Sequence, residues 1–381
     1  MVTISHGDDA TVMARFLPAA QAAGAVGRVR GQDSGRLFAD RIGRAGLLEF
    51  RSQRLTSRIL HPARDFEAVE TPVEVRWDPL TGYAARLVKG STPLLAPPTF
   101  DLEAFARDTQ TSCPFCGERI ESATPKLPAD ISVNGRISRG RALLFPNLLT
   151  YTQYSAVAVY SPDLHYLPLH AMTPQLVGDN LAAHVEYIKA VMRADGNAVW
   201  GSINANHMLP SGSSLFHPHL QSSIDPLPST FQEMLAAVPG DRFRAYLDGE
   251  QKIGERYIGS TGSIEWLASF APMGFNEVRA LIPGVCSPGE LAEDRIDELG
   301  KGIAAILNLY GELGFQSFNM ALYGVPPTNR EYMLNLRMVC RSNLQSLYRS
   351  DVTYFERLHW QAMVDTSPEE LATQARPKFA P

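Results

Sequence analysis

The chain of 381 residues has no excess of positive charge, since 35 Lys and Arg residues are set against 40 Asp and Glu residues. Proteins that bind the backbone of nucleic acids need clustered Lys and Arg, so we expect no nucleic-acid partner. No apolar run in the sequence approaches the roughly 18 residues that a membrane-spanning helix needs. The N-terminus carries Asp8 and Asp9 where a secretory signal has positive charge followed by an apolar core. We therefore expect a cytoplasmic protein with no membrane partner.

Cysteine is scarce, and two of the four cysteines lie close together in the string Cys113-Pro114-Phe115-Cys116-Gly117. Such usage suits a reducing compartment and a metal site better than a disulfide framework. Two cysteines separated by two residues can place both sulfurs on one tetrahedral ion, which makes this pair half of a zinc site. A thioredoxin-like redox pair is the alternative. That motif starts a helix beside a βαβ unit, and no such pattern surrounds this pair.

The composition, 45% apolar and 20% charged, is that of an ordinary globular protein, and the length allows two or three domains. Alternating apolar and polar residues before a Pro/Gly turn predict a strand and hairpin over residues 73–82. Thr173 before Pro174 predicts the start of a helix, with strands over residues 154–160 and 199–206 on either side. The order of strand, helix and strand recurs over residues 278–320, which indicates an internal repeat.

The segment from Gly212 to Gln221 holds two histidines around a proline. Pro218 fixes its own φ and stiffens the backbone. If the segment is extended, His217, His219 and Gln221 project to one face. The small residues before them let backbone N–H groups approach an anion closely, and neutral imidazole is available near neutral pH. The segment is therefore a candidate phosphate-handling site, and a polar loop that holds two histidines is the alternative.

Two strings in the chain resemble one known family. The longer one is Gly212-Ser213-Ser214-Leu215 followed by His217-Pro218-His219-Leu220-Gln221, which resembles the signature of the galactose-1-phosphate uridylyltransferase branch of the histidine-triad superfamily. The other, Arg76-Trp77-Asp78-Pro79-Leu80-Thr81-Gly82, resembles the N-terminal hairpin of the same transferases. The resemblance implies an α+β fold of duplicated histidine-triad-like units, each an antiparallel sheet with packed helices. We expect an N-terminal extension (1–70), a first unit with the zinc and catalytic motif (71–230) and a degenerate second unit (231–381).

The resemblance also implies roles for individual residues. In the family the second histidine of the motif attacks the α-phosphate of a nucleotide sugar, so His219 would be the nucleophile and Gln221 would bind the nucleotidyl phosphate. A structural Zn²⁺ ion would be held by Cys113, Cys116, His165 and His217. His170 is the alternative to His165, because the turn before it carries a one-residue insertion. Residues 355–372 resemble the closing helical segment of the family. The positions that match substrate-binding residues are Ser214, Asn206, Asn147, Arg86 and Gln361.

The predicted activity is the transfer of a nucleoside monophosphate, by default UMP, between a nucleotide sugar and a sugar 1-phosphate through a covalent nucleotidyl-histidine. Histidine-triad hydrolases carry a further histidine where this chain has Gln221. Glutamine cannot donate a proton as an acid at neutral pH, which favours transfer over hydrolysis. A phosphorylase of nucleotide sugars or dinucleoside polyphosphates is the first alternative.

A non-catalytic nucleotide-binding zinc protein is the second alternative, because the second repeat is degenerate. Where related enzymes can keep a further His-x-His, this chain has Tyr332-Met333-Leu334-Asn335-Leu336-Arg337. We therefore expect the second metal site of some family members to be absent. By analogy with the family, we expect a homodimer in which a neighbouring subunit completes each site.

Overall fold

The structure is a computed structural model that describes residues 48–88, 101–345 and 350–380. All of these residues belong to the unit Ile42–Pro381. Residues 1–47 of the expected N-terminal extension lie outside the described residues. None of the described helices is both long enough and apolar enough to cross a membrane.

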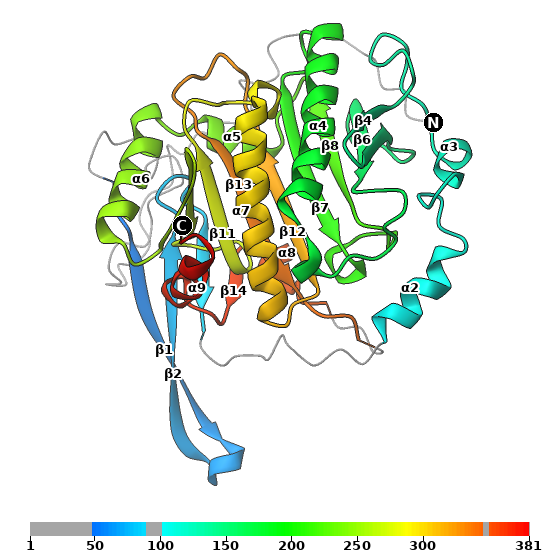
Figure 1. Ribbon diagram of the computed structural model, residues 1–381. Coiled ribbons are helices and arrows are strands. Elements are labelled where there is room, and N and C mark those ends of the chain that lie inside the picture. The colour runs from blue at the N-terminus through cyan, green and yellow to red at the C-terminus, as the bar shows by residue number, and fades with distance from the viewer. Residues whose placement is uncertain (1–47, 89–100, 346–349, 381) are drawn as a thin grey trace, which may run out of the picture. The chain divides into compact units, whose positions relative to one another are not determined.

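The main sheet is built from two sets of five strands. The first set is β4 (Ile137–Arg139), β5 (Ala142–Pro146), β6 (Tyr154–Val159), β7 (Trp200–His207) and β8 (His219–Asp225). The second set is β9 (Tyr257–Thr261), β10 (Ile264–Ala268), β11 (Phe275–Ile282), β12 (Ser317–Tyr323) and β13 (Leu334–Arg341). All neighbouring strands pair antiparallel, in the order β4-β5-β6-β8-β7-β12-β13-β11-β10-β9 (Figure 1). From the centre outward, the first set runs β7-β8-β6-β5-β4 and the second runs β12-β13-β11-β10-β9. Each set thus places its fourth strand at the centre, then its fifth, third, second and first.

One long helix accompanies each set of strands, between its third and fourth strand. These helices, α4 (Pro174–Ala194) and α7 (Glu293–Glu312), lie side by side across one face of the sheet (Figure 1). Thr173 caps α4 by accepting from the Leu176 N–H at 3.3 Å. Apolar residues three and four positions apart make the buried stripe of each helix. The predicted α+β fold of two antiparallel units with packed helices is therefore confirmed.

The face of the sheet opposite α4 and α7 carries the shorter helices α3 (Arg119–Ala123), α5 (Thr230–Ala236) and α6 (Gly240–Ile253). Another short helix, α2 (Leu102–Gln110), packs against Met208 and Phe216 in the segment between β7 and β8. Helices α5 and α6 contribute Phe231, Phe243 and Tyr246 to a second core, which they share with Leu267 and Leu281 of the main sheet. Since β8 alternates between the two faces, its odd-numbered residues face away from α4 and α7.

A smaller sheet has the order β1-β2-β3-β14, with β1 at Ser52–His61, β2 at Glu67–Trp77, β3 at Ala84–Leu87 and β14 at Ala362–Val364. Strands β1 and β2 form a long hairpin that extends away from the main sheet (Figure 1). The turn between β2 and β3 is held by Asp78, which accepts from the N–H groups of Leu80 and Thr81 at 2.9 Å each. The predicted strand and turn over residues 73–82 are confirmed.

Buried charges join this turn to the main sheet. Arg279 on β11 donates to the Asp78 carboxylate, and Arg337 on β13 donates to the same oxygen at 3.1 Å. The other arm of Arg337 donates to Glu277 at 2.7 Å. All four side chains are at least 96% buried. Arg337, where a family His-x-His would stand, is thus part of an ionic cluster that fastens the small sheet.

The C-terminal segment differs from the expected closing helical segment. Helices α8 (Tyr354–Arg357) and α9 (Pro368–Ala375) are separated by β14, which pairs in parallel with β3. The Ala362 N–H donates to the Tyr83 hydroxyl at 2.8 Å. This pairing with a strand almost 280 residues earlier outweighs the local helical preference.

Candidate active site

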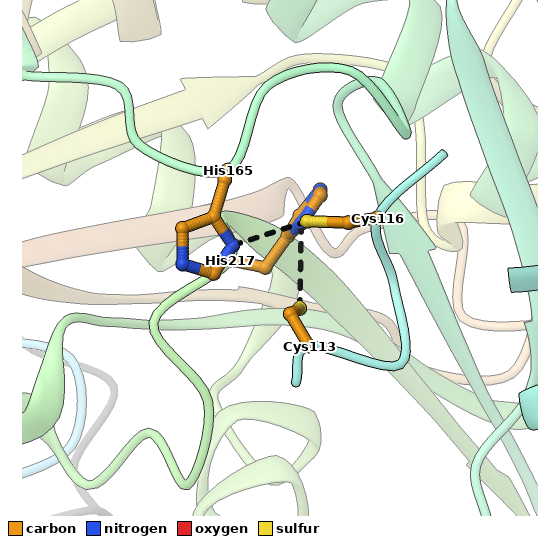
Figure 2. A group of neighbouring side chains, drawn as sticks. All are labelled: Cys113, Cys116, His165 and His217. Carbon is orange, nitrogen blue, oxygen red and sulfur yellow. Dashed lines mark hydrogen bonds between the residues drawn. The ribbon is translucent and has the colours of Figure 1, made fainter. Parts of the chain in front are cut away.

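Three loops bring together four side chains that could hold a metal ion. Cys113 and Cys116 lie between α2 and α3, His165 follows β6, and His217 immediately precedes β8. The ligand atoms of these four residues all lie within 4.8 Å of one another, and Figure 2 shows the four side chains converging. His170 is exposed and is not part of the group.

The histidines of this group each present Nδ1 to the cysteines. Cys116 Sγ lies 3.2 Å from Nδ1 of His165 and 3.4 Å from Nδ1 of His217, and Cys113 Sγ lies 3.8 Å from the latter nitrogen (Figure 2). Nε2 of His217 lies 2.9 Å from the Ser161 carbonyl oxygen, which can only accept, so the proton is on Nε2.

His165, like His217, carries its proton on Nε2 and turns Nδ1 towards the cysteines. Its Nε2 lies 2.9 Å from Oγ1 of Thr109, whose own proton is donated to the Phe105 carbonyl at 2.8 Å. Nε2 of His165 is therefore the donor, and the lone pair on Nδ1 faces the cysteines. Second partners of this kind fix the ring orientation of metal-binding histidines.

Burial sets the protonation of the group. It raises the pKa of the Cys116 thiol to about 12, with the neighbouring Cys113 adding to the shift, and it lowers the pKa of His217 to about 4. The His217 imidazole is therefore neutral and able to donate an electron pair at neutral pH. A cation that binds here must displace the thiol protons, because the thiolate is the ligand form. The four residues could hold a metal ion.

His219 is the first residue of β8, two residues after His217. Its ring carries the proton on the other nitrogen, compared with His217. Nδ1 of His219 lies 2.8 Å from the His217 carbonyl oxygen, so Nδ1 carries the proton. Nε2 accepts from the side-chain amide of Gln221 at 3.1 Å. Burial lowers the pKa of His219, which is 6% exposed. The motif therefore presents a neutral imidazole with its lone pair on Nε2, screened by a half-buried amide.

Comparison with known proteins identifies relatives of this chain. No known family profile matches it. It is 32% identical over 336 residues to an uncharacterised protein of Archaeoglobus fulgidus, and the match covers 86% of this chain and 98% of that protein. The chain belongs to the family of this archaeal protein.

Solved structures with the same fold as this chain are known. An ADP-glucose phosphorylase from Arabidopsis thaliana with bound ADP-glucose matches with a TM-score of 0.61 and 18% identity, over 80% of this chain and 98% of that one. A GalT-like protein from the same plant matches with a TM-score of 0.59 and 18% identity, over 79% of this chain and 98% of that one. A uridylyltransferase matches with a TM-score of 0.51 and 20% identity, over 80% of this chain and 98% of that one. The GalT-like fold that the motifs predicted is confirmed.

The other predicted substrate-binding residues of this family member lie in three places. Asn206 on β7 is opposite Asn319 of β12 and accepts from its amide at 2.6 Å. Asn147 follows β5, where its side chain accepts from the Leu149 N–H at 3.2 Å. Ser214 is exposed in the turn before β8. The N–H groups of Gly212 and Ser213 donate within that turn, to carbonyls of residues 209 and 208, so neither points to an anion.

Arg86 and Gln361 meet on the small sheet. Nε of Arg86 donates to Gln361 Oε1 at 3.1 Å, and its guanidinium lies over the Phe355 ring at 5.3 Å. In the described part of the chain, neither side chain hydrogen-bonds to His219 or Gln221. The structure thus brings these two predicted residues together with each other and not with the candidate nucleophile.

Sequence reasoning missed Asn319, which joins the two halves of the sheet. Its amide nitrogen donates to Asn206 and, at 3.0 Å, to the Ser211 carbonyl, while its oxygen accepts from Arg341 at 2.6 Å. Arg341 in turn is paired with Asp351 at 2.5 Å. Asn319 lies in the second repeat, 98 residues after Gln221, and only the pairing of β7 with β12 brings it next to Asn206.

Proposed function

We propose that this protein is a nucleotidyltransferase of nucleotide sugars that carries a nucleoside monophosphate, by default UMP, on Nε2 of His219. The observation that carries the proposal is the fixed ring of His219, whose Nδ1 proton is donated to the His217 carbonyl and whose Nε2 lone pair is free of the metal-binding group. A neutral imidazole held in this way is a nucleophile at neutral pH. The structural neighbours, which include a uridylyltransferase and an ADP-glucose phosphorylase, support the same chemistry.

In the first step a bond forms between Nε2 and the α-phosphorus, and the bond from that phosphorus to the bridging oxygen breaks. The electron pair leaves with the oxygen as the sugar 1-phosphate, which needs no proton from an acid. In the second step the phosphate oxygen of an acceptor sugar 1-phosphate attacks the same phosphorus and releases Nε2. Two displacements through a covalent intermediate predict ping-pong kinetics.

Gln221 has a defined part in this path. Its amide lies on Nε2, so an incoming α-phosphate must push it aside, and the amide N–H can then donate to a nonbridging oxygen. Donors aimed at developing charge are the main contribution that a protein makes to phosphoryl-type transfer. The hydroxyl of Ser214 and the amide of Asn206 are the further groups that we assign to the phosphates, and Asn147 we assign to the nucleoside.

We assign a structural Zn²⁺ ion to Cys113, Cys116, His165 and His217. A tetrahedral ion with Zn–S near 2.3 Å and Zn–N near 2.0 Å sets sulfur and nitrogen about 3.6 Å apart. The S···N distances of 3.2, 3.4 and 3.8 Å within the group bracket this value. Two thiolates and two imidazoles form a closed set with no position left for a substrate. The ion would fasten the loops around the start of β8, and His219 would keep its nitrogen for the substrate.

A second copy of the chain is assigned to the site on the strength of the family resemblance. Arg86 and Gln361 contact each other, not the candidate nucleophile of their own chain. We propose that they reach the phosphates and the sugar bound to a partner subunit in a homodimer.

Intact-mass measurement tests the main proposal. The protein is mixed with UDP-glucose, UDP-galactose or ADP-glucose, and the expected result is an added nucleoside monophosphate that is labile in acid and stable in base. The variant His219→Asn is expected to form no adduct. If no nucleotide sugar labels the protein, the proposal fails, and the alternative of a non-catalytic nucleotide-binding zinc protein is favoured.

A phosphorylase is the second candidate, because the neighbour with the TM-score of 0.61 is an ADP-glucose phosphorylase. In a phosphorylase inorganic phosphate would attack the nucleotidyl-His219 and give a nucleoside diphosphate. Incubation of a nucleotide sugar with phosphate alone separates the two candidates: a phosphorylase releases the nucleoside diphosphate, and a transferase does so only poorly without a sugar 1-phosphate.

A further inference from the structure

The hairpin of β1 and β2, which we call the arm (residues 52–77), has two unlike faces. Partners directly opposite in an antiparallel pair share a face, and side chains alternate between the two faces along each strand. One face holds Arg54 opposite Glu74 and Arg58 opposite Glu70. Opposite charges placed directly across a strand pair attract each other and can stay in water. This charged face therefore needs no cover.

The other face of the arm carries a stripe of side chains without charge. Leu55 is 39% exposed and Ile59 is 50% exposed, although both are large apolar side chains. The stripe is about 20 Å long, since its rows span six residues of each strand. We call it the arm stripe, and its cross-strand rows are Gln53–Val75, Leu55–Val73, Ser57–Thr71 and Ile59–Val69.

The rest of the described chain gives the arm little support. Within residues 48–88, 101–345 and 350–380, β1 pairs with β2 alone, and β2 pairs with β3 only from Glu74 to Trp77. All residues of β1 except His61 are exposed. A hairpin of two strands with nothing packed on its apolar face is at best marginally stable in water. The arm stripe therefore has the character of a surface that another molecule covers.

The charge of the arm narrows the choice of that molecule. Residues 52–77 contain four Arg and four Asp or Glu residues, so the arm is electrically balanced. Nucleic acids and anionic membranes attract clustered basic residues, and the arm offers them no excess of positive charge. A protein surface fits better. A stripe without charge can also meet a second copy of the chain around a two-fold axis, because no like charges are set against each other.

The strand register connects the arm stripe to the residues that we assign to a partner subunit. Val75, in the first row of the stripe, is directly opposite Arg86 on β3, so the two side chains share one face of the small sheet. Arg86 in turn donates to Gln361. Under the proposed function both residues reach the substrate bound to the partner. A second copy that lies against Arg86 therefore also lies against the base of the stripe.

We infer that the arm stripe packs against a second copy of the chain and extends the homodimer interface beyond the shared site. The inference rests on the proposed function, which supplies the homodimer. The interface buries the apolar side chains of the stripe and gives each arm the support that it does not receive from its own chain.

The test introduces a charge into the arm stripe of the full chain. Ile59→Lys and Val69→Lys change opposite members of one row, on different strands. Leu60→Lys is the matched control, because Leu60 is the next residue of β1, lies on the charged face and is 63% exposed. Sedimentation velocity over a dilution series, without substrate, gives the dissociation constant of the dimer.

We expect Ile59→Lys and Val69→Lys each to raise this dissociation constant about tenfold or more, because an ammonium group in the interface would be buried without a partner. Leu60→Lys should raise it less than about threefold. Equal effects of all three changes, or no effect of any, would overturn the inference. An unsubstituted protein that stays monomeric at the highest concentration tested would leave the stripe to a different protein, and would also overturn it.

Amide hydrogen exchange of the unsubstituted protein is the second measurement, since it does not require a variant to fold. Dilution below the dissociation constant should speed exchange in residues 52–73. Protection that is independent of concentration would mean that the stripe is covered by the protein's own chain, and would overturn the inference.

Failure of the proposed function is recognised separately, because neither measurement uses a substrate. A dimer that is sensitive to Ile59→Lys but forms no nucleotidyl adduct would reject the proposed function and keep the arm interface. Adduct formation by a dimer that tolerates Ile59→Lys would do the reverse.

Discussion

Gln221 and His219, two residues apart on β8, are joined by a hydrogen bond in which the side-chain amide donates to Nε2 of the ring at 3.1 Å. The other ring nitrogen donates to the His217 carbonyl at 2.8 Å. The motif thus orients the candidate nucleophile through groups on the same short segment. His217, a member of the candidate metal-binding group, immediately precedes that segment.

Gln221→Glu is expected to slow adduct formation about 100-fold or more. A carboxylate has no N–H for the α-phosphate, and its negative charge opposes the charge on the nonbridging oxygens. Removal of a single donor of this kind costs roughly 10²–10³ in rate. Rapid-quench measurement of the nucleotidyl adduct checks this. Gln374→Glu on the exposed side of α9 makes the same change of charge and should leave the rate unaltered; an unaltered rate in Gln221→Glu as well would contradict the assigned role.

Cys113→Ser is expected to lose the bound metal and to unfold at a lower temperature. Serine is a poor zinc ligand, and the metal-binding free energy, about 10 kcal/mol or more in zinc-finger peptides, contributes to folding. Metal content by mass spectrometry and thermal unfolding with and without a chelator check this. Cys286→Ser is the control, because that cysteine lies outside the group and bonds the Asn329 carbonyl, which a hydroxyl can also do. Full metal content in Cys113→Ser would refute the ligand set.

Mixing two inactive variants tests the shared site. His219→Asn and Arg86→Ala are each expected to lack activity, and a mixture of the two should recover about a quarter of the activity of the unsubstituted protein. Half of randomly formed dimers are mixed, and one of their two sites is intact. His219→Asn mixed with Gln221→Glu is the control, since both changes lie on β8 and no intact site can form. If the first mixture stays as inactive as the control, each site is complete within one chain.

Asp78→Ala is expected to destabilise the protein by roughly 3–5 kcal/mol, because it leaves the buried guanidinium of Arg279 without its carboxylate and that of Arg337 with Glu277 alone. Chemical denaturation gives the free energy of unfolding. Arg330→Ala removes an ion pair whose arginine is 68% exposed and should cost less than about 1 kcal/mol. Similar losses in the two variants would mean that the buried cluster is not what fastens the small sheet.

The stability of the protein should fall as the pH drops below about 6.5. Burial lowers the pKa of His207 to about 3 in the folded chain, while an unfolded histidine titrates near 6.5. Between these values the unfolded chain binds a proton that the folded chain does not, so the free energy of unfolding falls by up to about 1.4 kcal/mol per pH unit for this group. His207→Phe keeps the stack on Phe318, whose ring lies 5.1 Å away.

His207→Phe should therefore flatten the pH dependence by that amount and change little at pH 8. Urea denaturation at several pH values between 4 and 8 measures it. A slope equal to that of the unsubstituted protein would show that His207 takes up its proton in the folded state.

The candidate metal ligands and the candidate nucleophile could be predicted from the sequence because each lies in a short, recognisable motif. Two cysteines separated by two residues, and two histidines on either side of a proline, can be identified without knowing where their loops lie in the fold. The predicted strands and helices that flank them also depend on local patterns. His165 required knowledge of the turn after β6, and the structure selects it over His170.

Other parts of the site depend on contacts between distant segments. The bond between Arg86 and Gln361 spans 275 residues, and the one between Asp78 and Arg337 spans 259. β14 was expected to be helical, and only its pairing with β3 makes it a strand. No local pattern encodes such pairs, because strand register is chosen by the burial of whole sheets.

The sequence by itself determined which atoms can do chemistry: two thiols, two metal-facing imidazoles, one further imidazole and one amide. Only the tertiary structure decided which nitrogen each ring presents, because that depends on the carbonyl or hydroxyl that each other nitrogen meets. It also decided that Asn204, Ser223 and Tyr323 line one cavity, since the pairing of β8, β7 and β12 sets these side chains on a single face.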